Sequence, residues 1–106
     1  MTDSHMHCRV RISATSEEEA NLISKTLVKK RLVAGTMIYS GNCHYWWDNE
    51  IVEKRYWNIG AFSLTKHKDA IISEVEKLHS DECPIIAFNE IDGNRKFLQW
   101  IDEFIG

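Results

Sequence analysis

The residues best suited to hold a metal ion lie between positions 79 and 84, where the chain reads His-Ser-Asp-Glu-Cys-Pro. A histidine at a helix end, an acid close behind it and a thiol can converge in a loop that Pro84 restrains. Imidazole, carboxylate and thiolate groups bind copper and zinc. We therefore predict His79 and Glu82 as ligands of a divalent metal. The structural alternative is that His79 only stabilises the carboxyl end of a helix.

A second tract of possible ligands, His5, His7 and Cys8, lies near the amino terminus. Imidazole and thiol groups bind soft metals, but a functional site needs several ligands that converge in a fixed geometry. The Ser-His-Met sequence at positions 4–6 is also typical of an expression tag. We therefore expect residues 1–7 to be a tag or a flexible terminus.

The sequence offers no nucleophile together with its own base. Cys43 and His44 are adjacent, and neighbouring side chains of a strand point to opposite faces, so these two cannot form the hydrogen-bonded pair that covalent catalysis needs. Most carboxylates fall at helix caps, in turns and on helix surfaces. We expect a protein that is not an enzyme.

Three consecutive aromatic residues, Tyr45, Trp46 and Trp47, are followed by Trp57 in the next extended run. Because strand residues alternate between faces, one of the indoles at 46 and 47 lies outside any single core. The run 51–64 repeats the problem, with large apolar side chains on both of its faces. A sheet with so much apolar surface favours an oligomer, although aromatics scattered singly over a surface are a common alternative.

The composition fits one soluble domain covering residues 1–106. Apolar residues make up 43% of the chain, charged residues 27%, and the formal net charge is −3. The acidic balance weighs against nucleic acid as a partner, since that binding relies on a basic face. No segment has the length of a membrane span or the pattern of a signal peptide, so we expect a cytoplasmic protein with no membrane partner.

Hydrophobic periodicity predicts the order strand, helix, strand, strand, helix, strand and a final helix. Alternation over 9–14 indicates the first strand, and a capping box of Ser16 and Glu19 begins the first helix. Extended runs over 32–47 and 51–64 flank a turn at 48–50. A second helix is expected from Thr65 to about residue 79, a strand over 85–88, and a short helix near the end. This order is the ferredoxin-like split βαβ fold of the α+β class.

Taken in order along the chain, these features resemble the CutA family of divalent-cation tolerance proteins. The resemblance extends from about residue 10 to residue 104. The matching residues are Ser16–Ala20, Leu27–Val28, Arg31–Ala34, Tyr45–Trp47 with Ile51, Leu78–His79, Glu82, Pro84–Ile86, Gly93–Asn94, Phe97–Leu98 and Trp100. The family implies a ferredoxin-like subunit in a tight homotrimer and a link to copper and other divalent metals.

The chain departs from the family pattern at a few positions. Gly35 stands where the family usually has Cys, Phe62–Ser63 replaces Lys-Thr, Ser80–Asp81 replaces Pro-Tyr, and Ile85 replaces Glu. Because a cation and an anion are lost together, we predict that Phe62 and Ile85 pack as apolar side chains and that family-type ligands bind more weakly.

These observations predict a cytoplasmic homotrimer that binds a divalent metal, copper most plausibly, in a cleft between subunits. Tyr45, Trp47 and Trp100 would line the cleft, and His79 and Glu82 would be the ligands. One alternative is a trimeric regulator similar in architecture to the PII signalling proteins, which would bind a small anion or a protein partner and no metal. Another is a diverged scaffold without a ligand.

Overall fold

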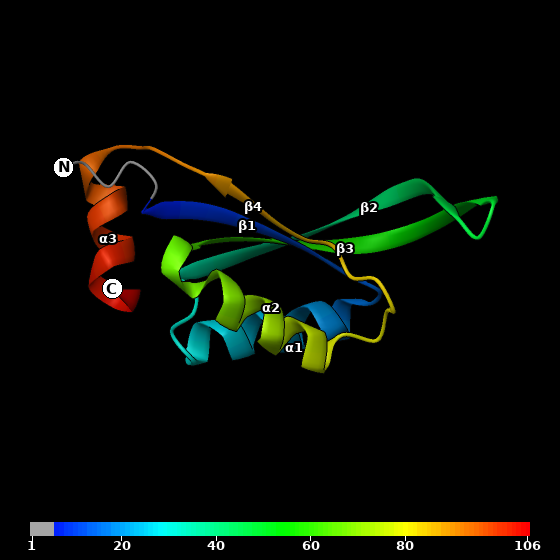
Figure 1. The fold of residues 1–106 in the computed structure, drawn as a ribbon, viewed down its shortest axis with the longest axis horizontal. Coiled ribbons are helices and arrows are strands. Elements are labelled where there is room, and N and C mark those ends of the chain that lie inside the picture. Colours follow the sequence, from blue (N-terminus) through cyan, green and yellow to red (C-terminus); the bar gives the residue numbers. More distant parts are fainter. Residues whose placement is uncertain (1–5) are drawn as a thin grey trace.

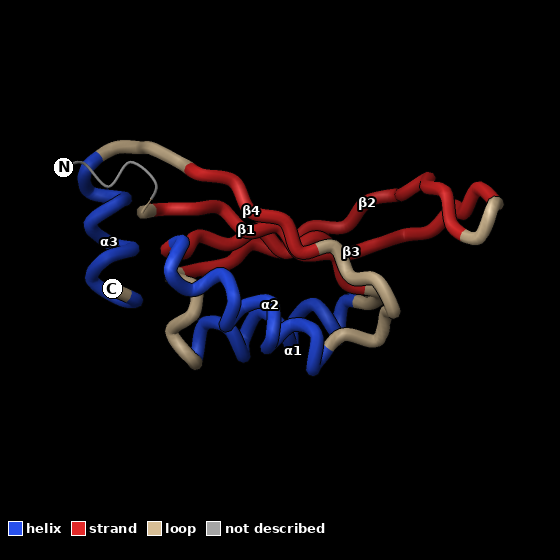
Figure 2. The backbone as a smooth tube through the Cα atoms, in the orientation of Figure 1, coloured by secondary structure: helices blue, strands red, loops and turns tan. Residues whose placement is uncertain are grey.

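The fold follows the order of elements that the sequence predicts. The computed structural model describes residues 6–106, with β1 (His7–Ala14), α1 (Glu17–Lys29), β2 (Gly35–Trp47), β3 (Glu50–Leu64), a 3-10 turn η1 (Thr65–His67), α2 (Lys68–Leu78), β4 (Ile86–Glu90) and α3 (Arg95–Ile105). The strands form one antiparallel sheet in the order β2-β3-β1-β4. Helices α1 and α2 cover the same face of this sheet (Figures 1 and 2). The predicted α+β fold is confirmed.

The first helix begins at the predicted capping box. The Oγ of Ser16 accepts a hydrogen bond from the backbone N–H of Glu19 at 3.1 Å. The carboxylate of Glu19 reaches back and accepts from the backbone N–H of Thr15 at 2.8 Å. These contacts satisfy donors that the first turn leaves without intrahelical partners, and they bring Glu19 to the end of β1.

A two-residue turn joins β2 and β3 into a long hairpin. Asp48 and Asn49 both have positive φ, 51° and 63°, as residues in tight hairpin turns do, and Trp47 pairs directly with Glu50. The pairing continues without interruption to Gly35 and Phe62. Figure 1 shows this hairpin extending far beyond the helices at one end of the molecule, with α3 at the other end.

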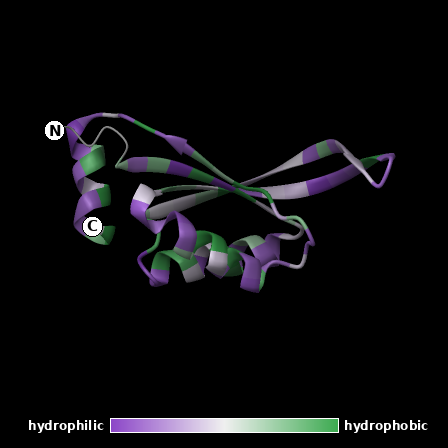
Figure 3. Ribbon diagram, in the orientation of Figure 1, coloured by the Kyte–Doolittle hydropathy of each residue, from purple (hydrophilic) through white to green (hydrophobic). Residues whose placement is uncertain are grey.

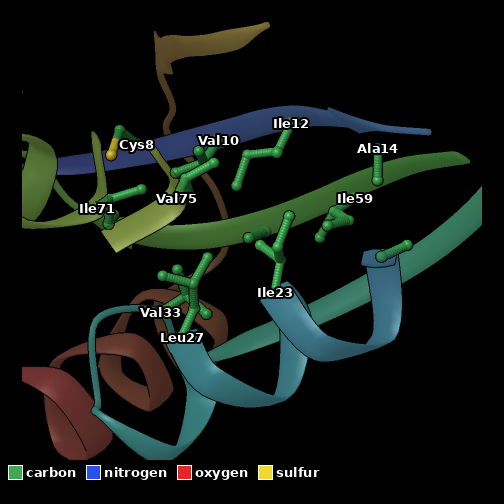
Figure 4. Packing of buried hydrophobic residues seen from close by; sticks show 12 residues of the cluster. Cys8, Val10, Ile12, Ala14, Ile23, Leu27, Val33, Ile59, Ile71 and Val75 are labelled. Carbon is green, nitrogen blue, oxygen red and sulfur yellow. The ribbon is translucent and has the colours of Figure 1, made fainter. Parts of the chain in front are cut away.

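The main core lies between the sheet and the two helices that cover it. Alternate strand residues meet the apolar stripes of α1 and α2, which appear as alternating green and purple segments in Figure 3. The fully buried side chains gathered in Figure 4 include Val10, Ile12, Ile23, Leu27, Ile59, Ile71 and Val75. Burial of each such side chain contributes about 1.5–3 kcal/mol of transfer free energy, which holds the helix layer against the sheet.

The opposite face of the sheet, here called the open face, is not covered by α1 or α2. Directly paired residues of antiparallel strands share a face, so the pairing defines its members. They are His7, Arg9, Arg11 and Ser13 of β1, the odd-numbered residues 35–47 of β2, the even-numbered residues 50–64 of β3, and Ala87 and Asn89 of β4. Its end near α3 is packed in a second cluster built on Leu64, Ile101 and Ile105. Farther along this face, Ser13, Tyr56 and Asn58 are also buried.

Helix α3 is tied to the rest of the fold by side chains at its carboxyl end. Cationic or imidazole groups from the loop after α1 and from η1 donate to its last carbonyl oxygens: Arg31 to Phe104 at 3.0 Å, His67 to Ile105 at 2.8 Å, and Lys66 to Gly106 at 3.2 Å. Such donors satisfy carbonyls that have no partner within the helix and complement the helix dipole.

Several expectations about element ends need correction. The second strand was expected from residue 32, but β2 begins at Gly35. The predicted cap Thr65 lies in η1, and its hydroxyl donates to the carbonyl oxygen of Met6, while α2 begins only at Lys68. The last strand begins at Ile86 and not at Ile85. His7 belongs to β1, so the possible flexible terminus does not extend that far. Residues 1–5, including His5, lie outside the described part of the chain.

Candidate functional site

The five predicted site residues fall at two separate ends of the molecule. Tyr45 and Trp47 lie on the open face of the hairpin, and His79 and Glu82 lie at the end of α2 and in the loop that follows it. Trp100 lies in α3, at the far end of the sheet (Figure 1). A single chain therefore brings the hairpin and the loop after α2 together, but it does not bring Trp100 to them.

His79 is held inside the protein through both nitrogens of its ring, and its side chain has no exposed area. Its Nδ1 accepts the backbone N–H of Asp81 at 3.0 Å. Its Nε2 hydrogen-bonds the carbonyl oxygen of Ser13, which can only accept, so Nε2 carries the proton and the ring is neutral. His79 thus joins the end of α2 to the end of β1, and binding a metal would require it to give up one of these partners.

Glu19 supports the same junction from α1. Its carboxylate accepts the backbone N–H groups of Ser80 and Thr15 at 2.9 and 2.8 Å, and one oxygen lies 3.8 Å from Nε2 of His79. Burial by itself raises the pKa of Glu19, but the hydrogen bonds from Ser80 and Thr15 outweigh it and lower the pKa overall. The ionised carboxylate is therefore the form that the fold stabilises.

A chain of hydroxyl groups links this junction to the hairpin. The Tyr56 hydroxyl donates to Oδ2 of Asp81 at 3.1 Å, and its oxygen lies 3.0 Å from the Tyr45 hydroxyl, which then donates to it. Burial, these hydrogen bonds and the charge of Asp81 raise the pKa of Tyr56. The two rings meet edge to face with centroids 6.0 Å apart. Tyr45 therefore does lie near the loop of His79 and Glu82, through Tyr56 and Asp81.

Sequence reasoning gave Glu19 only a capping role and treated Asp81 only as a departure from the family pattern. The contact of Glu19 with Ser80 and that of Asp81 with Tyr56 were missed, because they join residues 61 and 25 positions apart. The capping box was the one local signal that pointed to Glu19.

No metal cluster is assembled within the part of the chain that the structure describes. Over residues 6–106, no group of three or more His, Cys, Asp or Glu side chains is placed to hold an ion. Glu82 is exposed in the loop after α2. The pair of His79 and Glu82 as ligands therefore stays a prediction.

The amino-terminal tract is divided by the alternation of β1. His7 faces α3 and contacts Asp102 at 2.8 Å through Nε2. Cys8 points into the main core, where burial raises the pKa of its thiol despite the opposing charge of Lys68. These two side chains do not converge on one ion.

Trp100 packs across the start of β2, against Gly35. A methyl group added at Gly35 would lie only 2.8 Å from Cη2 of the indole. Trp100 also stacks on Phe97, with ring centroids 6.3 Å apart, and Phe97 meets Phe62 edge to face at 4.9 Å. Phe62 is thus packed as predicted. Ile85 is not, because 48% of it is exposed.

A groove of about 390 Å³ lies between α1 and α3 beside the indole of Trp100. Its walls come from Val28, Arg31, Trp100 and Phe104, among other residues. None of the other four predicted site residues lines it, so within one chain Trp100 belongs to a separate apolar surface.

Comparison with known proteins gives a consistent result. The sequence model of the family described as CutA1 divalent ion tolerance protein matches residues 8–104. The chain is 32% identical over 101 residues to the divalent-cation tolerance protein CutA of Archaeoglobus fulgidus, covering 94% of this chain and 99% of that protein. It is 34% identical over 99 residues to the CutA protein of Thermus thermophilus, covering 92% and 96%.

Solved structures agree with the sequence comparison. The structure of the A. fulgidus protein, described as a periplasmic divalent cation tolerance protein, superposes with a TM-score of 0.92 at 31% identity and covers 95% of this chain and 100% of that one. The T. thermophilus structure gives 0.91 at 33% identity, with 95% and 100% covered.

Replacing Glu19 by Gln should lower stability at pH 7 by about 1 kcal/mol, since the charged cap contacts are weakened. Because folding lowers the pKa of Glu19, this stabilisation is present above its ordinary value of 4.5 and is lost as the pH falls below it. Urea unfolding at pH 7 and at about pH 3.5 should show the gap between wild type and E19Q closing in acid. Glu18→Gln, an exposed change in the same helical turn, is the control. A gap that is equal at both pH values would contradict the assignment.

Replacing Gly35 by Ala should destabilise the protein by about 1–3 kcal/mol, because the new methyl group would displace the Trp100 ring. The matched control is Gly41→Ala in the same strand, where nothing lies within 4 Å of an added methyl group. Denaturant unfolding of both variants checks the expectation. Equal stabilities would mean that Trp100 moves aside without cost.

Proposed function

This chain belongs to the CutA1 divalent ion tolerance family, and we infer that it acts in divalent-cation tolerance as a homotrimer that binds a divalent metal, copper most plausibly, without being an enzyme. The cytoplasmic location expected from the sequence is part of this proposal. Within residues 6–106 no helix is long and apolar enough to span a bilayer. The match along nearly the whole chain does not favour the PII-like alternative.

The exposed aromatic tip of the hairpin is the observation that carries the homotrimer. Trp46 and Ile51 are direct partners on one face, and 72% and 63% of them are exposed. Trp47, on the other face, is 49% exposed. A soluble protein rarely leaves such a contiguous apolar surface uncovered, and aromatic side chains are enriched where subunits meet.

The separation of the predicted site residues also supports an assembly. Tyr45 and Trp47 lie in the hairpin at one end of the molecule, and Trp100 lies in α3 at the opposite end (Figure 1). A cleft that contains all three residues therefore needs two copies. Contacts that join one end of a subunit to the opposite end of the next are heterologous, and they form a ring when the rotation between successive copies closes. A ring of three copies would form three equivalent clefts.

The proposed metal site lies where the hairpin meets the loop after α2. The hydrogen bonds from Tyr45 through Tyr56 to Asp81 place the loop of His79 and Glu82 beside the hairpin. Glu82 is exposed there, and His79 would have to exchange one of its two protein partners for the ion. Ligands added by a neighbouring copy would complete the coordination.

Sedimentation at micromolar concentration should give a mass about three times the 12.4 kDa of the chain. The melting temperature should rise with protein concentration, since association stabilises only the folded form. Trp47→Glu should give monomers or aggregates, because it places an unpaired charge in a desolvated contact. Trp47→Phe, which keeps an aromatic ring, should stay assembled. A wild-type chain that sediments as a monomer would refute the homotrimer.

Calorimetric titration with Cu(II) should detect binding that weakens in acid, because metal ions compete with protons for an imidazole ligand. Glu82→Gln and His79→Ala should each lower the affinity, with circular dichroism to confirm that His79→Ala still folds. A chain with His5→Ala and His7→Ala controls for the amino-terminal tract. If this control loses all binding while Glu82→Gln retains it, the ion is held by the terminus and the proposed cleft site is wrong.

A further inference from the structure

Two arginines at the centre of the open face carry charge that the neighbouring strands do not balance. Arg9 and Arg11 are two positions apart in β1, so they share a face, and both are exposed. Among the strand residues of the open face, the only carboxylate is Glu50, at the distant tip of the hairpin. Two carboxylates from other elements approach this side, but each has a partner there: Asp102 of α3 contacts His7, and Asp81 accepts a hydrogen bond from Tyr56. On a chain with a formal charge of −3, the middle of the open face is therefore locally positive.

Small residues leave room around these guanidinium groups. Arg11 is paired with Gly60 on one side and with Ala87 on the other. A methyl group added at Gly60 would lie 3.9 Å from Nη2 of Arg9 and 3.9 Å from Cε1 of Tyr39, so both side chains converge above this glycine. The backbone at Gly60 therefore forms a shallow floor, with the guanidinium group of Arg9 and the ring of Tyr39 beside it.

Asn58 fixes the orientation of the second arginine. The Nε of Arg11 donates to Oδ1 of Asn58 at 3.3 Å, and Asn58 is nearly buried. This bond uses one of the five guanidinium donors and leaves the two amino groups for another partner. No hydrogen bond or ion pair to Arg9 is found among residues 6–106, so its donors are available as well.

We propose that Arg9 and Arg11, above the floor formed by Gly60, bind a phosphate-type oxyanion, and that the homotrimer of the previous subsection encloses it. A planar guanidinium group matches two oxygens of a phosphate, and two such groups on adjacent positions of one face can hold a dianion together. The enclosure rests on the proposed homotrimer, whereas the binding residues all lie in one chain.

Assembly makes an anion more necessary. If copies cover the open face, Arg9 and Arg11 leave water, and a guanidinium group buried without a partner destabilises the contact. Three copies around one axis also bring the same positive patch together three times. An oxyanion supplies both the missing charge and the missing hydrogen-bond acceptors.

The test compares inorganic phosphate with chloride at equal ionic strength. Phosphate should raise the melting temperature of the wild-type chain above that in chloride, and calorimetry should give a dissociation constant for it. The double variant Arg9→Gln with Arg11→Gln should bind phosphate at least tenfold more weakly. Arg11→Lys keeps the positive charge but loses the planar guanidinium group, so its phosphate affinity should lie between those of the wild type and the double variant. Arg95→Gln, an exposed arginine at the start of α3, should behave as wild type.

Equal melting temperatures in phosphate and chloride, or the same phosphate response in the double variant, would overturn the proposal. A further contrary result is a double variant that loses assembly while the wild-type melting temperature stays the same in phosphate and chloride. That result would mean that the arginines pair with carboxylates of a neighbouring copy, and it would also overturn the proposal. Sedimentation in chloride alone decides the homotrimer separately. A monomer that binds phosphate through Arg9 and Arg11 would retain the anion site and remove only its enclosure.

Discussion

The alternation of strand side chains between two faces is the constraint on which the rest of this molecule depends. Helices α1 and α2 lie on the same side of the sheet, so they can bury only every second residue of each strand (Figure 1). The other set, which includes Arg9, Tyr39 and Trp47, remains on the open face. The core, the exposed aromatics and the positive patch are consequences of this one division.

Hydrogen bonds around His79 join the helices to the sheet at one end of the helix layer. Its neutral ring joins α2 to β1, Glu19 adds α1, and the hydroxyl groups of Tyr56 and Tyr45 extend the contact to the hairpin. A polar network that is fully hydrogen-bonded in a half-buried setting favours one arrangement of the elements it touches. His79, one of the two expected metal ligands, therefore also holds the fold together, and a metal bound to it would compete with structural hydrogen bonds.

Local pattern was sufficient to predict most of the fold. The alternation at Val10, Ile12 and Ala14 and the Ser16 capping box mark elements whose signals lie within a few residues, and the structure has them as expected. The start of α2 was misplaced because the hydroxyl of Thr65 is used by Met6, 59 residues away. The hydrogen bond between His79 and Ser13, 66 residues away, and the contact of Trp100 with Gly35 likewise join distant segments. Sequence periodicity carries no information about such pairs, so the candidate site was predicted less well than the elements that hold it.

The position of β1 at the middle of the sheet has a consequence for the order in which the chain folds. Ile12 pairs with Ile59 on one side and with Ile86 on the other, so the central strand waits for segments made much later in the sequence. The hairpin needs only its own two strands, which are joined by a two-residue turn. Hairpins form in about 1–10 μs, whereas contacts of large sequence separation are slower to close. Trp46 and Trp47 are therefore presented to solvent on a formed hairpin before the core exists, which favours association between incompletely folded chains.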